Sequence, residues 1–309
     1  MSDPATSGAA VVAEDVAAAL AAGRAVVALE STIITHGLPR PRNLEVAREL
    51  EAIVRAGGAV PATVAVLDGA VRIGLADAEL ERLAAADDVA KASVRDLPVL
   101  LARGADGATT VAATAHLARR AGIRVFATGG LGGVHRGAAA TFDESADLPA
   151  LARTPIVVVC AGVKSILDAG ATLERLETLG VPVLGFGTNR LPGFTQVDGG
   201  HDLVWRVDDP AEVAAARRQA DTLGVTAAVV VTRPVDADAA LDPALHDRVL
   251  AAALADVDAR GITGKDVTPF LLDAMRRGTG GASLEANVAA VRGNAALAAE
   301  VAVALAAAA

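Results

Sequence analysis

Short apolar segments that alternate with helical patterns constrain the fold of this 309-residue chain more than any other feature. Residues 25–29, 155–161 and 225–232 consist mainly of Ala, Val, Leu and Ile, which is typical of strands that are buried on both faces. Between these segments, apolar residues recur at helical spacing. Strands that alternate with helices predict a layered α/β sheet. The sequence contains no low-complexity linker and no internal repeat, so we expect a single domain over residues 1–309.

The same patterns predict the individual elements. We expect strands over residues 25–29, 60–67, 70–73, 123–127, 155–161, 181–185 and 225–232. We expect helices over residues 9–22, 43–56, 77–85, 110–121, 165–179 and 210–223, and a mainly helical chain after residue 232. Asn43 is expected to cap the second helix. This layout places Glu30, Thr128 and Lys164 at the carboxyl ends of strands, where open α/β sheets usually bind ligands.

Composition limits the partners of the chain. Hydrophobic residues make up 53% of the sequence but aromatic residues only 2%, so the core is expected to be closely packed Ala, Val, Leu and Ile. A net charge of −9 and few aromatic stacking platforms argue against nucleic acid as a partner, although a small anionic substrate stays compatible. The single cysteine, Cys160, lies in an apolar run and is expected to be a core residue, with no disulfide within the chain.

No segment predicts export or membrane insertion. The amino terminus lacks both the basic start and the uninterrupted apolar stretch of a signal peptide. We also expect no apolar run of membrane-spanning length. The sequence therefore predicts a soluble cytoplasmic protein without a membrane partner.

The scarcity of lysine draws attention to Lys164. The chain has three lysines, at positions 91, 164 and 265, and arginine carries the remaining positive charge. Arginine stays protonated in proteins, so only lysine can provide a neutral amine nucleophile. Lys164 directly follows the apolar run 155–163, and a desolvated lysine in a cleft is a Schiff-base candidate. The alternative is a mutational bias toward Ala, Arg and Gly that left three lysines at random positions.

Glu30 ends the first predicted strand and is followed by several hydroxyl residues. A carboxyl group at the rim of a buried sheet can protonate a leaving group near neutral pH. Alternatively, Glu30 caps the next element or forms a salt bridge with Arg40 or Arg42. His36, further along the same loop, is more typical of a structural histidine.

A glycine-dense turn follows the strand at 123–127. Glycines at 129, 130, 132 and 133 allow backbone N–H groups to approach an anion, and Thr128, His135 and Arg136 add donors suited to a phosphate. The spacing differs from the G-x-G-x-x-G motif of dinucleotide-binding loops. A purely structural turn is the alternative.

Two carboxylates follow this turn. Asp143 and Asp147 are four residues apart and share one face if the segment is helical. Carboxylates without nearby cysteine or clustered histidine suit a hard cation such as Mg²⁺ or Mn²⁺. Asp143 could instead be a helix N-cap.

The remaining candidates lie elsewhere along the chain. Lys91 flanks a predicted loop and could bind an anion or simply be solvated. Lys265 is expected in a turn before a helix, with a structural role. Ser283 is expected to cap a helix, with Asn287 one turn further on.

Several of these segments together resemble the pseudouridine-5′-phosphate glycosidase family. The matching motifs are ALESTII at residues 28–34, ATGGLGGVHRG at 127–137, DESAD at 143–147, CAGVKSILD at 160–168 and SLEAN at 283–287. The likeness runs in order from about residue 10 to residue 305. The resemblance implies a three-layer α/β/α fold with a mostly parallel or mixed sheet, a homotrimer and one divalent cation per subunit, usually Mn²⁺.

The resemblance also implies a reaction, in which pseudouridine 5′-phosphate and water give uracil and ribose 5-phosphate. Glu30 would be the proton donor, Lys164 the nucleophile on C1′ of the ring-opened ribose, and Asp143 the metal ligand. A further set would contact or neighbour the phosphorylated nucleoside: Lys91, Val111, Thr128, His135, Ser145, Ala146, Asp147 and Asn287. A C–C glycosidic bond has no heteroatom leaving group, and an iminium at C1′ allows uracil to be expelled at carbon.

Two segments depart from the expected family pattern. Residues 185–195 lack the usual acidic pair and tyrosine, with Asn189 and Arg190 there, and residues 232–234 are Thr-Arg-Pro instead of Ala-Asn-Pro. Three alternative functions stay open. They are a Schiff-base aldolase acting on a sugar phosphate, a pigment-biosynthesis relative of the same fold, and a noncatalytic sugar-phosphate-binding protein.

Overall fold

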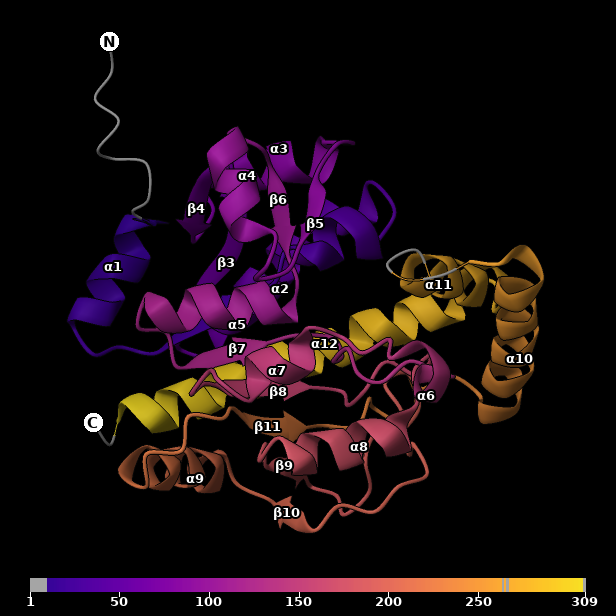
Figure 1. The fold of residues 1–309 in the computed structure, drawn as a ribbon. Coiled ribbons are helices and arrows are strands. Elements are labelled where there is room, and N and C mark those ends of the chain that lie inside the picture. The colour runs from indigo at the N-terminus through magenta and orange to yellow at the C-terminus, as the bar shows by residue number, and fades with distance from the viewer. Residues whose placement is uncertain (1–9, 263, 265–266, 308–309) are drawn as a thin grey trace.

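The computed structural model describes residues 10–262, 264 and 267–307. Lys265 lies outside the described residues, so its expected turn has no counterpart here. The described chain forms one mixed sheet with helices on both faces (Figure 1). This arrangement confirms the predicted three-layer α/β/α fold.

The central strands of the sheet are parallel. The main path runs β1-β4-β3-β2-β7-β8-β11-β9-β10, while β5 and β6 join it through β3. Every pair from β3 across to β10 along this path is parallel, whereas β4 and β6 run antiparallel to β3. The strands are β1 (Val11–Val12), β2 (Val26–Leu29), β3 (Val60–Leu67), β4 (Ala70–Ile73), β5 (Ala90–Ala92), β6 (Gly107–Thr109), β7 (Val125–Ala127), β8 (Val157–Cys160), β9 (Val183–Phe186), β10 (Trp205–Val207) and β11 (Val229–Thr232).

Burial on both faces explains the continuous apolar runs. In β8, Val157 and Val159 join one core cluster, whereas Val158 and Cys160 join the cluster on the opposite face. Helices α2 (Arg42–Ala56), α3 (Asp77–Ala85), α9 (Pro210–Thr222) and α12 (Ala282–Ala306) contribute to the first cluster. Helices α1 (Glu14–Ala21), α4 (Leu97–Arg103), α5 (Val111–Arg120), α7 (Asp147–Leu151) and α8 (Ala169–Thr178) contribute to the second.

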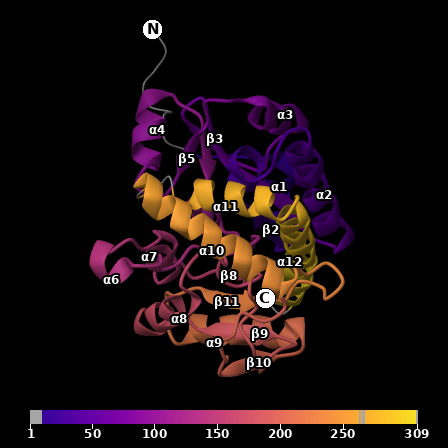
Figure 2. The ribbon, with the colours of Figure 1, turned by 90° about the vertical axis from the view of Figure 1, so that its right-hand side faces the viewer.

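Two further helices extend past the carboxyl edge of the sheet. Helices α10 (Pro243–Arg260) and α11 (Val267–Gly278) pack on each other and form a third apolar cluster with the segment after β8. Figure 2 looks onto this edge, with α10 and α11 in front of the strands. A short π-helix, η2 (Ile33–Gly37), follows β2, and α6 (Ala138–Thr141) follows the glycine turn.

Helix α12 corrects one expectation. With 25 residues and a mean hydropathy of 1.5 in its most apolar window, it reaches membrane-spanning length and composition, although no such run was expected. In the described structure, 61% of that window is buried, and the helix packs against β2, β7, β8, α2 and α9. It is therefore a core helix of the α/β domain. A core helix can be as long and as apolar as a membrane-spanning helix.

Most predicted elements are confirmed, but several details were wrong. Asn43 lies inside α2 and is buried, where its amide donates to the carbonyls of Ile34 and Ala84 at 2.8 and 3.0 Å. Ser283 lies inside α12, whose N-cap is Gly281. Residues 142–146 are not helical, so Asp143 and Asp147 do not share a helix face. The sequence patterns did not predict β1, β5, β6, β10 or α4.

Candidate active site

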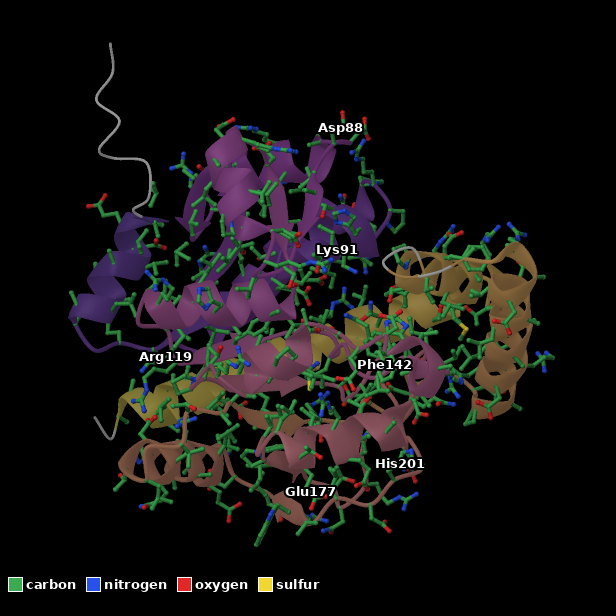
Figure 3. All side chains as sticks on the ribbon, in the orientation of Figure 1. Asp88, Lys91, Arg119, Phe142, Glu177 and His201 are labelled. Carbon is green, nitrogen blue, oxygen red and sulfur yellow. The ribbon has the colours of Figure 1, made fainter. Side chains whose placement is uncertain are left out.

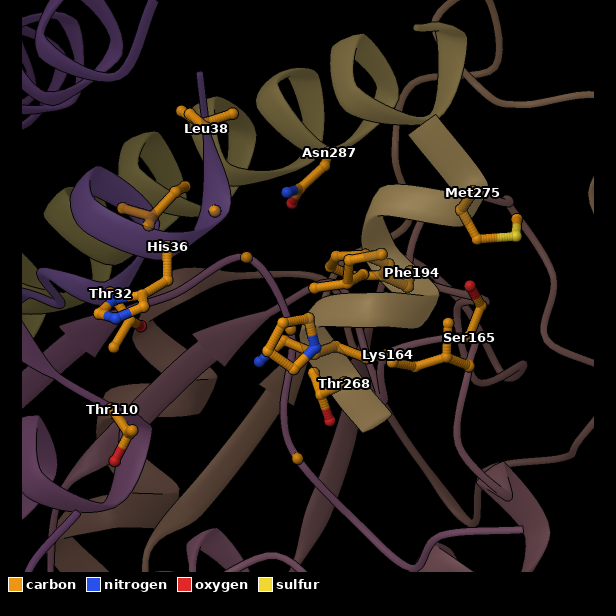
Figure 4. Close-up of a pocket in the computed structure, with 18 of the residues that line it drawn as sticks. Thr32, His36, Leu38, Thr110, Lys164, Ser165, Phe194, Thr268, Met275 and Asn287 are labelled. Carbon is orange, nitrogen blue, oxygen red and sulfur yellow. The ribbon is translucent and has the colours of Figure 1, made fainter. Parts of the chain in front are cut away.

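Three neighbouring parallel strands end at the candidate site. Strand β7 lies between β2 and β8, so the segments after all three emerge at the same edge of the sheet. A cavity of about 470 Å³ opens there, and Glu30, Lys164 and the glycine turn all line it. Figure 4 shows Lys164 in this cavity, with Phe194 and Asn287 nearby. The predicted grouping of strand-end residues is thus present in the structure.

Glu30 is buried and held by two hydroxyl groups. Glu30 is only 8% exposed. The hydroxyls of Thr32 and Thr128 donate hydrogen bonds to its two carboxylate oxygens. Arg40 and Arg42 pair with other acidic groups instead. The salt-bridge alternative for Glu30 was therefore wrong, and the carboxyl group faces the cavity without a bonded cation among the described residues.

Lys164 is half-buried in the turn that follows β8, and it lines the cavity. Its backbone N–H donates to the carbonyl of Leu131 at 3.0 Å, while the N–H of Leu131 donates to the carbonyl of Gly162 at 2.9 Å. These bonds tie the lysine turn to the glycine turn. Gly162 has φ of +87° and a Cβ there would stand 2.3 Å from the carbonyl oxygen of Pro192, so the turn requires glycine.

Asp147 organises the glycine turn. It is 5% exposed, and its two carboxylate oxygens accept the backbone N–H groups of Ala112 and Gly132, both at 2.9 Å. A Cβ at Gly132 would lie 2.2 Å from Ser145 Oγ and 2.6 Å from Asp147 Oδ2. Ser145 and Asp147 line the cavity, whereas Ala146 is exposed and does not. The glycines of this turn thus allow a close approach of two chain segments.

Lys91 brings a second amine to the cavity. Lys91 lies on β5 (Figure 3) and lines the cavity, and Val111 lines it from the first turn of α5. Burial by its neighbours, followed by repulsion from Lys164, lowers the pKa of Lys91. Burial, followed by repulsion from Lys91, also lowers the pKa of His36, which lines the cavity from η2. Lys91, Lys164 and His36 therefore lie in one cavity of a chain with net charge −9.

His135 and Asp143 lie together beyond the glycine turn. His135 lines the cavity, and its Nδ1 is 3.9 Å from a carboxylate oxygen of Asp143, which itself is not among the lining residues. The described residues contain no group of three or more His, Cys, Asp or Glu side chains arranged to hold a metal. This pair fits a cation that keeps most of its water ligands, as Mn²⁺ and Mg²⁺ do.

Helices α11 and α12 supply the wall opposite the strands. Asn287 of α12 lines the cavity, and its Oδ1 is buried without a protein partner. Further lining residues that no sequence motif indicated are Phe194, Thr195 and, from α11, Thr268, Pro269, Leu272, Asp273, Met275 and Arg276. The amphipathic pattern of α11 could have shown that the helix packs, but not that part of it faces a cavity.

The two segments that differ from the expected family pattern, residues 185–195 and 232–234, contribute differently to the cavity. Residues 185–195 provide Phe194 and Thr195, while Asn189 and Arg190 are not among the cavity-lining residues. Arg190 pairs instead with Asp198 and Asp202. Thr232 and Arg233 also do not line the cavity. Thr128 likewise does not, and it reaches the site through its bond to Glu30.

Together, the fold and the site define an α/β/α protein with a lysine and a buried carboxyl group in one cavity at the carboxyl edge of a parallel sheet. Residues 15–304 match the family described as Indigoidine synthase A like protein, and the chain belongs to that family.

Individual relatives agree with this assignment. The chain is 62% identical over 297 residues to a pseudouridine-5′-phosphate glycosidase of Frankia alni, covering 96% of this chain and 82% of the relative. It is 64% identical over 293 residues to the protein of the same name from Streptomyces griseus, covering 94% and 91%.

Solved structures share the whole fold. The prealnumycin C-glycosynthase AlnA in complex with ribulose 5-phosphate superimposes with a TM-score of 0.91 at 40% identity, covering 97% of this chain and 98% of that chain. An indigoidine synthase A-like protein from Thermotoga maritima gives a TM-score of 0.86 at 36% identity, covering 92% and 94%.

Proposed function

We propose that this chain is a C-glycosidase that reversibly cleaves pseudouridine 5′-phosphate to uracil and ribose 5-phosphate. The observation that carries the proposal is the presence of Lys164 and Glu30 in one cavity, at the ends of β8 and β2. Relatives that are more than 60% identical bear the name of this activity, and a structural neighbour named as a C-glycosynthase holds a pentulose phosphate. An amine and a carboxyl group are the two groups that the chemistry requires.

The proposed steps use Lys164 as nucleophile and Glu30 as proton donor. When the ribose ring opens, the C1′–O4′ bond breaks, O4′ keeps the electron pair and takes a proton from the carboxyl group of Glu30. The lone pair of uracil N1 forms a double bond between C5 and C1′ through the ring, so C1′ becomes electrophilic. The neutral amine of Lys164 adds to C1′, returns the electron pair to the uracil ring and gives its surplus proton to the Glu30 carboxylate. Glu30 then delivers this proton to C5 of uracil, and the C1′–C5 bond breaks as the nitrogen lone pair forms the C1′=N bond. Water hydrolyses the protonated imine, which releases ribose 5-phosphate, and the lysine returns its surplus proton to Glu30.

The hydroxyls that hold Glu30 are consistent with a group that both loses and regains a proton. Thr32 and Thr128 donate hydrogen bonds to its two carboxyl oxygens and so keep the group in one orientation between turnovers. The low exposure of Glu30 limits the access of bulk water to this proton. Lys91 adds a second amine to the part of the cavity that Lys164 lines.

Phosphate binding is assigned to the crowded basic side of the cavity. Lys91 supplies a charge, and Val111 lies at the amino end of the ten-residue helix α5, whose dipole favours an anion. Ser145 and Asp147 support the glycine turn, with Ala146 between them, and Thr128 and His135 flank it. Asn287 offers its unpaired amide oxygen to a hydroxyl or N–H group of the substrate.

We infer that Asp143 holds a divalent cation, Mn²⁺ in the first instance, with His135 close by. One carboxylate next to one imidazole leaves several coordination positions for water, in keeping with a hard cation. A bound cation would supply positive charge to balance the substrate phosphate. The remaining steps depend on the side chains alone.

The proposed assembly is a homotrimer in the cytoplasm, and the family resemblance is its support. Sedimentation velocity measures the assembly directly. A species of three times the mass of 30.8 kDa is expected, and a monomer or dimer would contradict the proposal.

A single experiment tests the reaction and the nucleophile. Purified protein is incubated with pseudouridine 5′-phosphate and Mn²⁺, and uracil is measured by chromatography. In parallel, ribose 5-phosphate is trapped with borohydride and the adduct is located by peptide mass spectrometry. We expect uracil release and an adduct on Lys164 in the wild type, with both absent in Lys164→Ala.

The same data separate the alternative functions. An adduct without uracil release, but with cleavage of a sugar-phosphate carbon chain, would indicate an aldolase. No turnover of pseudouridine 5′-phosphate, together with joining of a pentose phosphate to an aromatic acceptor, would indicate a pigment-type C-glycosynthase. Binding of ribose 5-phosphate that survives Lys164→Ala, without any turnover, would indicate a noncatalytic binding protein.

A further inference from the structure

A second asparagine of α12 lies beneath the candidate site. Asn294 has an exposed fraction of 0% in a helix that is otherwise mainly Ala, Val and Leu. It is seven residues after Asn287, so both lie on the same face of the helix. Its Nδ2 donates to the carbonyl oxygens of Thr128 and Gly129, at 2.8 and 3.3 Å.

The orientation of this amide is fixed by its partners. Both partners are carbonyl oxygens, which only accept, so the NH₂ group must face them. The amide oxygen then points away, and it is buried without a hydrogen-bond partner. An unpaired buried acceptor destabilises the folded chain. An apolar residue would avoid it, but would remove the amide donor of the Thr128 carbonyl. The asparagine therefore acts through the two hydrogen bonds that it donates at the end of β7.

The two carbonyls belong to the residues that connect Glu30 with the lysine turn. The Thr128 side chain donates to Glu30. The carbonyl of Gly129 also accepts the N–H of Ala161 at 2.9 Å, three residues before Lys164. The amide of Asn294 therefore holds the backbone at Thr128 and Gly129. Thr128 bonds to Glu30 through its side chain, and Gly129 bonds to the segment that leads to Lys164 through its carbonyl.

We propose that Asn294 is a positioning residue that sets the placement of Glu30 relative to Lys164 through Thr128 and Gly129. This inference rests on the proposed C-glycosidase function. Loss of the amide donors leaves Thr128 and Gly129 free to shift, and a misplacement of 1 Å at reacting groups costs about 100-fold in rate. Imine formation needs Lys164 and the open sugar, whereas C–C cleavage also needs Glu30. The cleavage step is therefore the one that Asn294 controls.

The principal test compares Asn294→Leu, which keeps the branched shape and the number of heavy atoms but removes the donors, with Val301→Ala. Val301 is fully buried on α12 two turns further along, and its side chain has no hydrogen-bond donor, so it controls for loss of packing in the same helix. We expect Asn294→Leu to retain the borohydride adduct of ribose 5-phosphate on Lys164. Its kcat for uracil release should fall by about 100-fold, with KM changed by less than about threefold. Val301→Ala should keep a kcat close to that of the wild type.

A mutant cycle keeps the proposal testable if Asn294→Leu folds poorly. Asn294→Ser and Thr128→Val are measured alone and together. Because Asn294 acts through Thr128, the double variant should lose no more activity than the more damaging single change. Independent, multiplying losses would overturn the proposal. So would a kcat for Asn294→Leu within about threefold of Val301→Ala. Failure of the wild type to release uracil would instead refute the proposed function, which separates the two failures.

Discussion

Replacement of Asp147 by asparagine tests whether this residue organises the site. Asp147 is almost fully buried, and each carboxylate oxygen accepts one backbone N–H, from Ala112 and from Gly132. An asparagine can accept only one of them, and its NH₂ group faces the other. A hydrogen bond to a charged group contributes about 1.5–3 kcal/mol, and a buried unpaired N–H costs a further 1–3 kcal/mol, roughly.

The expected loss of stability for Asp147→Asn is therefore about 2.5–6 kcal/mol. For a chain of this size, each kcal/mol lowers the melting temperature by about 2 °C, which gives a decrease of about 5–12 °C. Differential scanning calorimetry measures this shift. Asp209→Asn is the matched control, because Asp209 also accepts one backbone N–H, from Ala211 at 2.7 Å, but as an exposed helix N-cap. Asparagine caps helices as well as aspartate does, so no significant change is expected there.

The result that refutes this reasoning is specific. If Asp147→Asn melts within about 2 °C of the wild type, the two backbone bonds do not carry the stability assigned to them. Asp147 would then be a substrate contact only, and KM would rise while the melting temperature stayed constant. A combined decrease in melting temperature and in affinity for ribose 5-phosphate agrees with a residue that holds the glycine turn in place.

Four further outcomes are expected. Glu30→Gln should lower uracil release by about 10²- to 10⁴-fold while the adduct on Lys164 still forms, as seen by chromatography and mass spectrometry; undiminished release would contradict a proton-donor role. Burial and Lys164 lower the pKa of Lys91, so its charge, and with it phosphate affinity, is lost as pH rises through that lowered value. The KM for pseudouridine 5′-phosphate should thus rise with pH below the ordinary lysine pKa of 10.5. Lys91→Arg stays charged and should abolish this rise. Identical pH profiles of KM for the wild type and Lys91→Arg would contradict phosphate binding by Lys91. Asp143→Asn should weaken Mn²⁺ binding measured by calorimetry, and unchanged affinity would place the metal elsewhere. Cys160 is fully buried with its thiol pKa raised to about 12, so iodoacetamide should leave the native protein unmodified at pH 8 and alkylate it in guanidinium; rapid native labelling would mean the core opens readily.

The central strands could be predicted because burial on both faces makes every residue of such a strand apolar or small. Strands β2, β8 and β11 are buried on both faces and read as continuous apolar runs. By contrast, β10 has the pattern Trp-Arg-Val, and its first two residues are exposed. It forms because its neighbour β9 offers free backbone groups. Such pairing leaves no trace in the local pattern of hydrophobicity.

The lysine turn shows why one boundary was wrong. Residues 165–179 have helical spacing, but α8 begins only at Ala169, after an N-cap in which Asp168 accepts the N–H of Ala171 at 2.9 Å. The N–H of Lys164 is already bonded to Leu131. Tertiary pairing with the glycine turn thus holds this segment out of the helix. That pairing places the lysine side chain at the cavity.

The metal and phosphate candidates were harder to interpret from the sequence. Asp143 and Asp147 lie four residues apart, but Phe142 between helices α6 and α7 has φ of +55°, which breaks the helical path. The two carboxylates therefore have different roles. Asp143 lies near His135, while Asp147 binds backbone groups from two distant segments. Only the folded chain brings those segments together.

The strand-end rule explains which site residues sequence reasoning can find and which it cannot. Glu30, Thr128 and Lys164 follow parallel strands, so chain order and sheet order together place them at one edge. The opposite wall comes from α11 and α12, and α12 crosses behind β2, β7 and β8. The apolar residues of α12 predict that the helix is buried on most of its surface. They do not indicate which of its turns packs against the ends of the strands. Asn287 and Asn294 are the exception to this lack of signal, because an amide in an apolar helix requires polar partners. Asn294 finds them in the carbonyls at the end of β7, and Asn287 faces the cavity.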